Sequence, residues 1–300
     1  MSKNKFQILF TGLVSCMLLF SACQKMNRPG LGDYPKDSNP PGGPLKFYVA
    51  FDGTTANPLM NAVDSIRANF PSDNPLASTD GVSGKGVQGA SKRFIRYPSF
   101  NDWAASSSFS VSVWFKKNGQ TTNNVGGNGP EYIFSLRARR RDAQNNYHWS
   151  NAVMFLFLEG NNAGCAVKAM CVSPSVASNP NSSPRDNWFT WENAQSIPGL
   201  LNDQWHHLVI VYDETNSAMR LYVDGVANAN IKSWAGQGAI RLSQSFISEY
   251  RVGRGPRNDN DGDGEAGWLQ SSFKGKMDQL RFYGKALTAA EVTALFTAKQ

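Results

Sequence analysis

The stretch QWHHLVIVYDETNSAMRLYVDG, residues 204–225, contains two short apolar runs separated by the polar or small residues DETNSA. The runs, 208–212 and 219–223, are rich in β-branched and aromatic residues, and the segment between them is typical of a turn. The stretch therefore predicts an antiparallel β-hairpin. His206 and His207 are sequence neighbours, so on a strand they face opposite sides and cannot bind one metal ion together. We expect one imidazole to be buried and hydrogen-bonded and the other to be exposed.

The same composition recurs on both sides of the hairpin. Short β-branched and aromatic runs bounded by Gly, Asn, Asp or Pro are LKFYVAFDG, FSVSVWFKK, YIFSLRA, AVMFLFLEG and MDQLRFYG. In FSVSVWFKK, Val111, Val113 and Phe115 alternate with residues on the opposite face, as in a half-buried strand. Several such strands joined by polar turns predict an all-β sandwich or barrel.

A short helix is expected at the end of the chain, in LTAAEVTALFTAKQ. Thr288 and Glu291 have the spacing of a capping box, and Leu287 and Val292 have the spacing of a hydrophobic staple, so the helix should begin at Ala289. The side chains expected to pack this helix on the sandwich are Val292, Leu295 and Phe296.

The start of the chain has the features of an export signal. Lys3 and Lys5 precede an apolar run that ends in small residues, which is typical of a signal peptide. The FSAC ending resembles a bacterial lipobox, which implies removal of residues 1–22 and acylation of Cys23. A transmembrane anchor and secretion with an unmodified Cys23 are the alternatives, and polar residues within the run disfavour the anchor.

The next segment, residues 23–44, is dense in Pro, Gly and small polar residues. It buries too little apolar surface to order itself and is predicted to be a flexible tether. Residues 45–300 then form the folded body, a length that a sandwich accommodates as one domain.

The formal net charge of the chain is +7, and removal of residues 1–22, with two lysines and no acid, leaves 28 minus 23, or +5. The basic run RARRR, 137–141, is either a patch for nucleic acid or anionic glycan or a solvated loop or strand edge. Export of the chain argues against nucleic acid as a partner.

Two cysteines remain once Cys16 leaves with the signal and Cys23 takes the lipid. In an oxidising compartment two spare thiols usually pair, so we expect a local disulfide between Cys165 and Cys171, with free thiols as the alternative. The spacing of the two, without a nearby histidine, does not suit a zinc site.

Four segments taken together resemble the concanavalin A-like, laminin G type of bacterial jelly roll. They are FDGTTANPLMNAVDS (51–65), FSVSVWFKK (109–117), the hairpin, and FKGKMDQLRFYGKALTAAEVTALF (273–296). The resemblance implies two packed, curved antiparallel sheets, frequent binding of polysaccharide or oligosaccharide, and a structural calcium ion in many relatives. The lipoprotein arrangement is similar to accessory lipoproteins of Gram-negative glycan-uptake systems. It implies a lipid anchor in the outer membrane, facing the surface or the periplasm, and a transporter complex as a possible partner.

The chain departs from a minimal domain of this type in residues 118–203, which hold the arginine run and both cysteines. We expect this stretch to be a long insert that decorates one rim of the sandwich. Long inserts on a rigid scaffold commonly carry specificity.

Calcium has two candidate places. DNDGDG, 259–264, supplies Asp259, Asp261 and Asp263 at alternate positions, like the first half of a calcium loop, although position twelve is a glutamine and the alternative is a solvated turn. The resemblance implies a second place formed by an acid on the first strand and an acid on the last, here Asp52 and Asp278.

Sugar binding uses a flat aromatic face and a few polar groups that bond hydroxyls. The candidate aromatic residues outside regular strand patterns, each of which could instead cover the core under a loop, are Tyr147, Trp149, Trp188, Trp191, Trp234 and Trp268.

Common signatures of hydrolases and of phosphate-binding enzymes are absent from the sequence. Retaining glucanases of this fold carry paired acids on one strand as Glu-x-Asp-x-Glu, and no such run, nucleophile elbow or phosphate loop occurs. We expect a non-catalytic, lipid-anchored glycan-capture module. The alternatives are a structural or protein-binding module and, less favoured, a glycoside hydrolase or lyase whose acids meet only on folding.

Overall fold

The computed structural model describes residues 43–70, 76–98, 106–123, 129–138, 152–176, 179–240, 247–256 and 268–299, with only the backbone of 174–176 and 179–185. All of these residues belong to one compact unit, Ser38–Gln300. The predicted signal peptide, the tether up to residue 42 and Cys23 lie outside the described residues. In the part that is described, no helix is long and apolar enough to cross a membrane.

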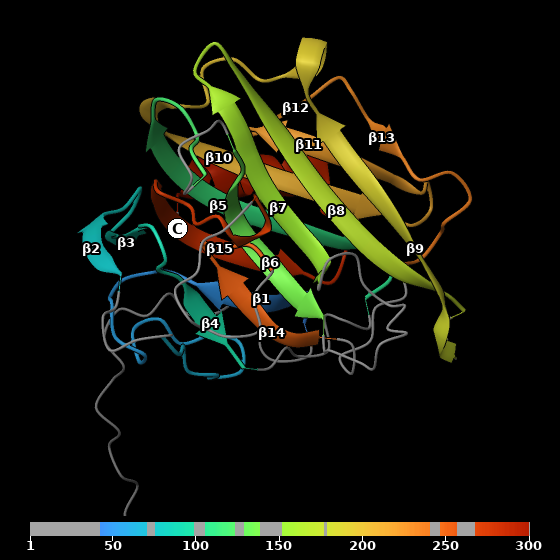
Figure 1. Ribbon diagram of the computed structural model, residues 1–300, viewed down its shortest axis with the longest axis horizontal. Helices are drawn as coiled ribbons and strands as arrows, with labels where there is room; N and C mark the ends of the chain where they lie inside the picture. Colours follow the sequence, from blue (N-terminus) through green and yellow to red (C-terminus); the bar gives the residue numbers. More distant parts are fainter. Residues whose placement is uncertain are drawn as a thin grey trace, which may run out of the picture. The chain divides into compact units, whose positions relative to one another are not determined.

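The described strands form two antiparallel sheets, as the sequence predicts (Figure 1). The larger sheet has the order β12-β11-β10-β5-β15-β3-β2, with β1 beside β15 and β13 beside β11. Its strands are β1 (Leu45–Val49), β2 (Ala77–Asp80), β3 (Lys85–Gln88), β5 (Phe109–Asn118), β10 (Asn202–Asp213), β11 (Ala218–Val223), β12 (Val226–Ala227), β13 (Lys232–Ser233) and β15 (Lys276–Tyr283).

The smaller sheet has the order β4-β14-β6-β7-β8-β9. Its strands are β4 (Ile95–Tyr97), β6 (Glu131–Ala138), β7 (Ala152–Asn161), β8 (Gly164–Val176), β9 (Asn179–Trp191) and β14 (Ile247–Val252). Two short 3-10 turns, η2 (Asn193–Gln195) and η4 (Trp268–Gln270), lie outside the strands. The chain ends in the helix α2 (Ala289–Ala298).

The core lies between the two sheets because apolar side chains alternate along the strands. Leu156 and Leu158 of β7 and Val167 and Ala169 of β8 are buried in the shared core. The residues between them on β7, such as Phe157, point to the opposite face of the smaller sheet and form a separate apolar cluster. This second face is the one that carries the candidate site.

The hairpin at residues 204–225 is confirmed. Strands β10 and β11 pair with Leu208 opposite Val223 and Tyr212 opposite Met219. His207 is fully buried, with its Nε2 2.8 Å from the hydroxyl of Ser112. His206 is only partly exposed rather than open to solvent, because its Nδ1 lies 2.8 Å from the carboxylate of Asp224.

Strand β5 is buried on both faces, which corrects the expectation of a half-buried strand. Its outer face is covered by the C-terminal segment: the ring of Phe296 stacks on Trp114 at 5.5 Å between centroids, and the backbone N–H of Leu287 donates to Ser110. The helix begins at Ala289 with the predicted capping box of Thr288 and Glu291. The expected cap and packing of α2 are therefore confirmed.

The stretch 118–203 is not an insert on a rim, so that prediction is wrong. It supplies β6, β7, β8 and β9, the four strands that complete the smaller sheet on one side of β14. In Figure 1 the strands β7, β8 and β9 pass in front of β5, β10 and β11. Two of these strands were visible as apolar runs, but the polar β9 gave no strand pattern.

The predicted disulfide is also wrong, because Cys165 and Cys171 are free thiols. Both lie on β8, where Cys165 is opposite Gly160 and Cys171 is opposite Met154. Six steps along an extended strand separate their Cα atoms by about 20 Å, whereas a disulfide needs roughly 4.4–6.8 Å. The two thiols are buried in the core and cannot meet.

Candidate functional site

The outer face of the smaller sheet holds a pocket of about 470 Å³ at its β7, β8 and β9 end. The register places Lys168 of β8 between Phe157 of β7 and Thr190 of β9, so all three side chains share the face that points away from the core. The side chains that line the pocket are Pro130, Phe157, Glu159, Lys168, Trp188, Thr190, Glu192 and Trp268.

One half of the pocket is aromatic. Trp188 of β9 and Trp268 of η4 lie with their ring centroids 6.2 Å apart and their planes inclined by 43°. Phe157 meets both indoles edge-on, at 6.2 and 6.4 Å. Trp268 is 38% exposed and Trp188 is half-buried, so the pair presents an angled apolar wall to solvent.

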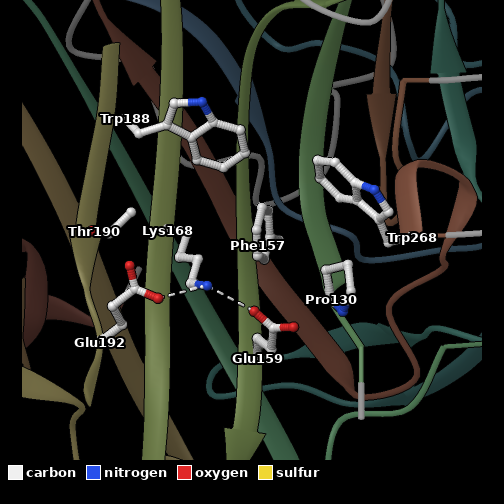
Figure 2. Close-up of a pocket in the computed structure, with 8 residues that line it drawn as sticks. All are labelled: Pro130, Phe157, Glu159, Lys168, Trp188, Thr190, Glu192 and Trp268. Carbon is white, nitrogen blue, oxygen red and sulfur yellow. Dashed lines mark ion pairs between the residues drawn. The ribbon is translucent and has the colours of Figure 1, made fainter. Parts of the chain in front are cut away.

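The other half of the pocket is charged. The Lys168 Nζ lies 2.9 Å from Glu159 Oε2 and 2.8 Å from Glu192 Oε2. Figure 2 shows Lys168 between the two glutamates, with the tryptophans toward the opposite end of the pocket. Glu159 lies on β7, Lys168 lies on β8 and Glu192 directly follows the last residue of β9, so the pairing of these three strands positions the cluster.

The contacts of Lys168 with the glutamates favour the charged forms of Lys168 and Glu192. A hydrogen bond from Lys168 lowers the pKa of Glu192. Burial acts to lower the pKa of Lys168, but hydrogen bonds to Glu192 and Glu159 outweigh it and raise that pKa. Two carboxylates and one ammonium give the described lining a net charge of −1. Apolar rings at one end and hydrogen-bond acceptors at the other suit a small ligand with both an apolar face and hydroxyl groups.

The structure separates the tryptophans that the sequence grouped together. Trp188 and Trp268 lie in the pocket, but Trp191 and Trp234 are buried in the core, which corrects their assignment as ligand-binding residues. Trp191 points inward because it lies an odd number of residues from Trp188 on the same strand, and its Nε1–H donates to the carbonyl of Asn230 at 2.7 Å. Tyr147 and Trp149 lie outside the described residues.

Sequence reasoning missed the charged half of the pocket. Glu159 and Lys168 lie on two different strands, Glu192 directly follows a third, and the three residues share no sequence motif. The alternation on β7 could have placed Glu159 on the outer face, but only the strand order of the sheet brings the other two beside it.

The two acids that the resemblance implies for calcium flank the turn between β2 and β3. Asp278 Oδ2 accepts from the backbone N–H groups of Val82, at 2.7 Å, and Ser83, at 3.3 Å. Asp52 Oδ1 accepts from the N–H of Lys85 at 3.0 Å. Asp278 is fully buried, and its Oδ1 has no hydrogen-bond partner among the residues that the structure describes. Burial raises the pKa of Asp278 to about 7, and the nearby charge of Asp52 adds to this effect.

Two glycines in that turn make room for the carboxylates. A Cβ on Gly81 would lie 2.3 Å from Asp278 Oδ2, and a Cβ on Gly84, which has φ of +63°, would lie 2.7 Å from Asp52 Oδ1. Both acids therefore approach one short loop, with hard oxygen donors of the kind that calcium prefers. Across the described ranges, no group of three or more His, Cys, Asp or Glu side chains could hold a metal. Asp259, Asp261 and Asp263 lie outside those ranges.

The arginine run is described only at its start. Arg137 lies on β6, and its guanidinium Nη1 is 3.5 Å from the Oε1 of Glu249 on β14. Arg139, Arg140 and Arg141 are outside the described part of the chain.

Solved structures of similar fold share little sequence with this chain. Domain 4 of AbnA, a GH43 extracellular arabinanase from Geobacillus stearothermophilus, solved with arabinotriose, is 19% identical with a TM-score of 0.49, over 84% of this chain and 97% of that one. The binding domain of botulinum neurotoxin DC in complex with rat synaptotagmin II is 14% identical with a TM-score of 0.51, over 86% of this chain and 52% of that one. The same domain in complex with SialylT is 13% identical with a TM-score of 0.50, over the same shares.

The chain thus spans about half the length of the toxin chains that it matches. At these identities the likeness shows the fold alone. No curated protein matches the chain. The model of the concanavalin A-like lectin/glucanases superfamily matches residues 89–293. Since this match covers more than half of the chain and agrees with its two antiparallel sheets, the chain belongs to the concanavalin A-like lectin/glucanases superfamily.

Proposed function

We propose that the chain is a binding module that captures carbohydrate in the pocket of β7, β8 and β9 without cleaving it. The observation that carries this proposal is the pairing of the half-buried Trp188 ring and the exposed Trp268 ring with a charged cluster in one pocket. An indole face packs against the apolar C–H side of a sugar ring, and carboxylate oxygens accept hydrogen bonds from its hydroxyls. The pocket volume of about 470 Å³ lies within the usual range for small-ligand sites.

The similar structures do not choose between ligand classes. The toxin binding domain has been solved both with SialylT and with rat synaptotagmin II, so this fold is compatible with more than one kind of partner. The choice of carbohydrate rests on the shape and chemistry of the pocket. A protein partner would be better served by a broad, flat apolar patch than by a narrow pocket with a charged end.

Binding without bond cleavage is supported by the state of the two pocket acids. Glu159 and Glu192 are brought together only by folding, which is the arrangement that a hydrolase would need. However, both acids form ion pairs with Lys168, and that contact lowers the pKa of Glu192. A glycosidase needs one protonated carboxyl group as its general acid, and the contact with Lys168 opposes that protonation at Glu192.

A structural calcium ion is part of the proposal. Asp52 and Asp278 would hold it, and backbone carbonyls or water would complete its shell, since described side chains supply only these two acids. The buried Asp278 Oδ1 without a hydrogen-bond partner fits an oxygen ligand directed at a cation. A bound cation supplies positive charge that compensates the buried carboxylate.

The lipid anchor, the outer-membrane location and the transporter partner rest on the sequence of the chain's start. The basic residues, the apolar run and the FSAC ending support acylation of Cys23. We propose that the anchor keeps the module at the envelope, where it presents glycan to an uptake system.

A glycan array tests the class of ligand. The full-length chain in mild detergent is applied to neutral, acidic and amino polysaccharides, with calcium and with chelator, and bound glycans are then assayed for new reducing ends. The proposal expects binding to a subset of glycans and no new reducing ends. No detectable binding to any glycan, together with capture of a membrane protein, would favour the protein-binding alternative. Release of reducing ends would make the chain a hydrolase.

A further inference from the structure

We infer that this pocket selects uncharged sugars or amino sugars and rejects sugars that carry a carboxylate or a sulfate. The inference rests on the proposed function and concerns the charged half of the same pocket. It assigns the selection to Glu159 and Glu192, with Lys168 holding both in place.

The exposure of the three charged groups supports this selection. The Lys168 side chain is 18% exposed, whereas the side chains of Glu159 and Glu192 are 32% and 36% exposed. The Lys168 side chain is thus less exposed than either glutamate, and its ammonium already contacts both carboxylates. A ligand therefore meets carboxylate oxygens first, and it meets them where the described lining has a net charge of −1.

Sugar hydroxyls are good partners for such oxygens, because each hydroxyl donates one hydrogen bond and a carboxylate only accepts. An acidic substituent has no donor to offer and would bring a third negative charge beside two that are already present. Like charges in a partly desolvated site are strongly unfavourable, and specificity commonly comes from such repulsion. The ammonium of an amino sugar would instead gain an ion pair.

Whether Lys168 attracts an acidic sugar depends on whether its ammonium is already paired with carboxylates. A free lysine in a sugar site would attract an acidic sugar. Here Lys168 has 2.9 and 2.8 Å contacts to two carboxylates, so two of its three N–H donors are used and its charge is already compensated. An acidic group that reached the remaining N–H would lie beside both glutamates, and their repulsion opposes that contact.

Affinity measurements on matched polymers test the inference. The full-length chain is titrated with galactan and polygalacturonate, with mannan and alginate, and with chitosan oligosaccharides. We expect each neutral polymer that binds to bind at least about tenfold more tightly than its acidic counterpart, and we expect the gap to narrow as salt screens the repulsion. Glu192→Gln should also reduce the difference in affinity between the neutral and the acidic polymers. The matched control is Asp203→Asn, which removes one charge from the partly exposed partner of Lys116 on the other sheet.

The outcomes separate this inference from the function beneath it. Equal or tighter binding of an acidic polymer, lost in Lys168→Met, would overturn the inference and leave carbohydrate binding standing. An unchanged gap in Glu192→Gln would also overturn it, because the discrimination would then come from shape. No detectable binding to any of the polymers would overturn both the proposed function and this inference.

Discussion

The indole of Trp188 on β9 lies 6.2 Å from the indole of Trp268 on η4, measured between ring centroids, with a 43° angle between the planes. Coplanar rings spaced along a groove would form a platform for an extended polysaccharide chain. Two inclined rings in contact instead form one wall, with room beside it for a short part of a glycan. If the proposed function is correct, the pocket therefore holds up to about two or three sugar units.

This geometry predicts how affinity depends on ligand length. For oligosaccharides of one to six units of a glycan that binds, affinity should rise up to about two or three units and then stay level, since further units find no ring to stack on. Titration calorimetry across the series measures the dependence. A continued rise to six units would contradict the single-wall description of the pocket.

The raised pKa of Asp278 predicts that the free energy of unfolding falls as the pH rises. Burial raises its pKa to about 7, above the ordinary value of 3.8, so the folded state prefers the protonated acid. The corresponding contribution to the free energy of unfolding, at most about 4 kcal/mol, is complete below pH 4 and is lost as pH rises through 7. Urea unfolding in the presence of chelator measures the free energy of unfolding of wild type and of Asp278→Asn, and the difference between the two should change from pH 4 to above pH 7. A difference that does not depend on pH would contradict the raised pKa of Asp278.

The same carboxylate gives a test of the calcium proposal. Added calcium should restore the stability that wild type loses near pH 8, because the ion binds only the folded state and compensates the ionised Asp278. The measurement is the midpoint of thermal unfolding, with magnesium as a control ion. Calcium should have much less effect on Asp278→Asn. Equal shifts for both proteins would place calcium elsewhere.

The lowered pKa of His207 predicts that the free energy of unfolding falls as the pH is lowered. Burial, together with the charge of Arg281, lowers its pKa from 6.5 to about 4. Its contribution to the free energy of unfolding, roughly 3 kcal/mol at most, is complete above pH 6.5 and is lost as pH falls through 4. His207→Gln should abolish this loss of stability at acid pH while keeping a partner for Ser112. The control is His206→Gln on the other face of the strand, which should still lose stability at acid pH. If the control also failed to lose stability at acid pH, the assignment to His207 would be contradicted.

The cysteine geometry predicts two free thiols in the folded body. Alkylation of the denatured, unreduced chain should modify both Cys165 and Cys171, because their positions along β8 keep them apart. Peptide mass analysis detects the label. A disulfide-linked peptide containing both cysteines would show that residues 165–171 do not form the extended strand described for β8.

Local sequence patterns predicted the elements that depend on local physics. The hairpin around residues 204–225 has alternating apolar residues and a polar turn, and the helix has its own cap in Thr288 and Glu291, so both could be recognised without the rest of the fold. The opposite faces of His206 and His207 followed from strand geometry alone. These features need only neighbours in sequence.

The pocket could be predicted only in part, because its residues meet through strand order. Trp188 and Trp268 stood out as aromatic residues outside regular patterns, yet nothing local distinguished Trp188 from the buried Trp191 without the register of β9. Lys168 sits between β7 and β9, a relation that exists only after long-range pairing. The mistaken insert had the same cause, since a polar edge strand such as β9 lacks the apolar alternation that identifies strands.

The central claim, that the wall of Trp188 and Trp268 binds sugar, is tested most directly by calorimetric titration of single variants. The glycan that the array selects is titrated into wild type, Trp188→Ala and Trp268→Ala, with Trp205→Ala as the matched control from the larger sheet. We expect each pocket variant to lose at least about fivefold in affinity, from the roughly 1–3 kcal/mol that a stacked ring contributes. The control should bind like wild type, and thermal unfolding checks that all four proteins are folded. Unchanged affinity in both folded pocket variants would contradict the account.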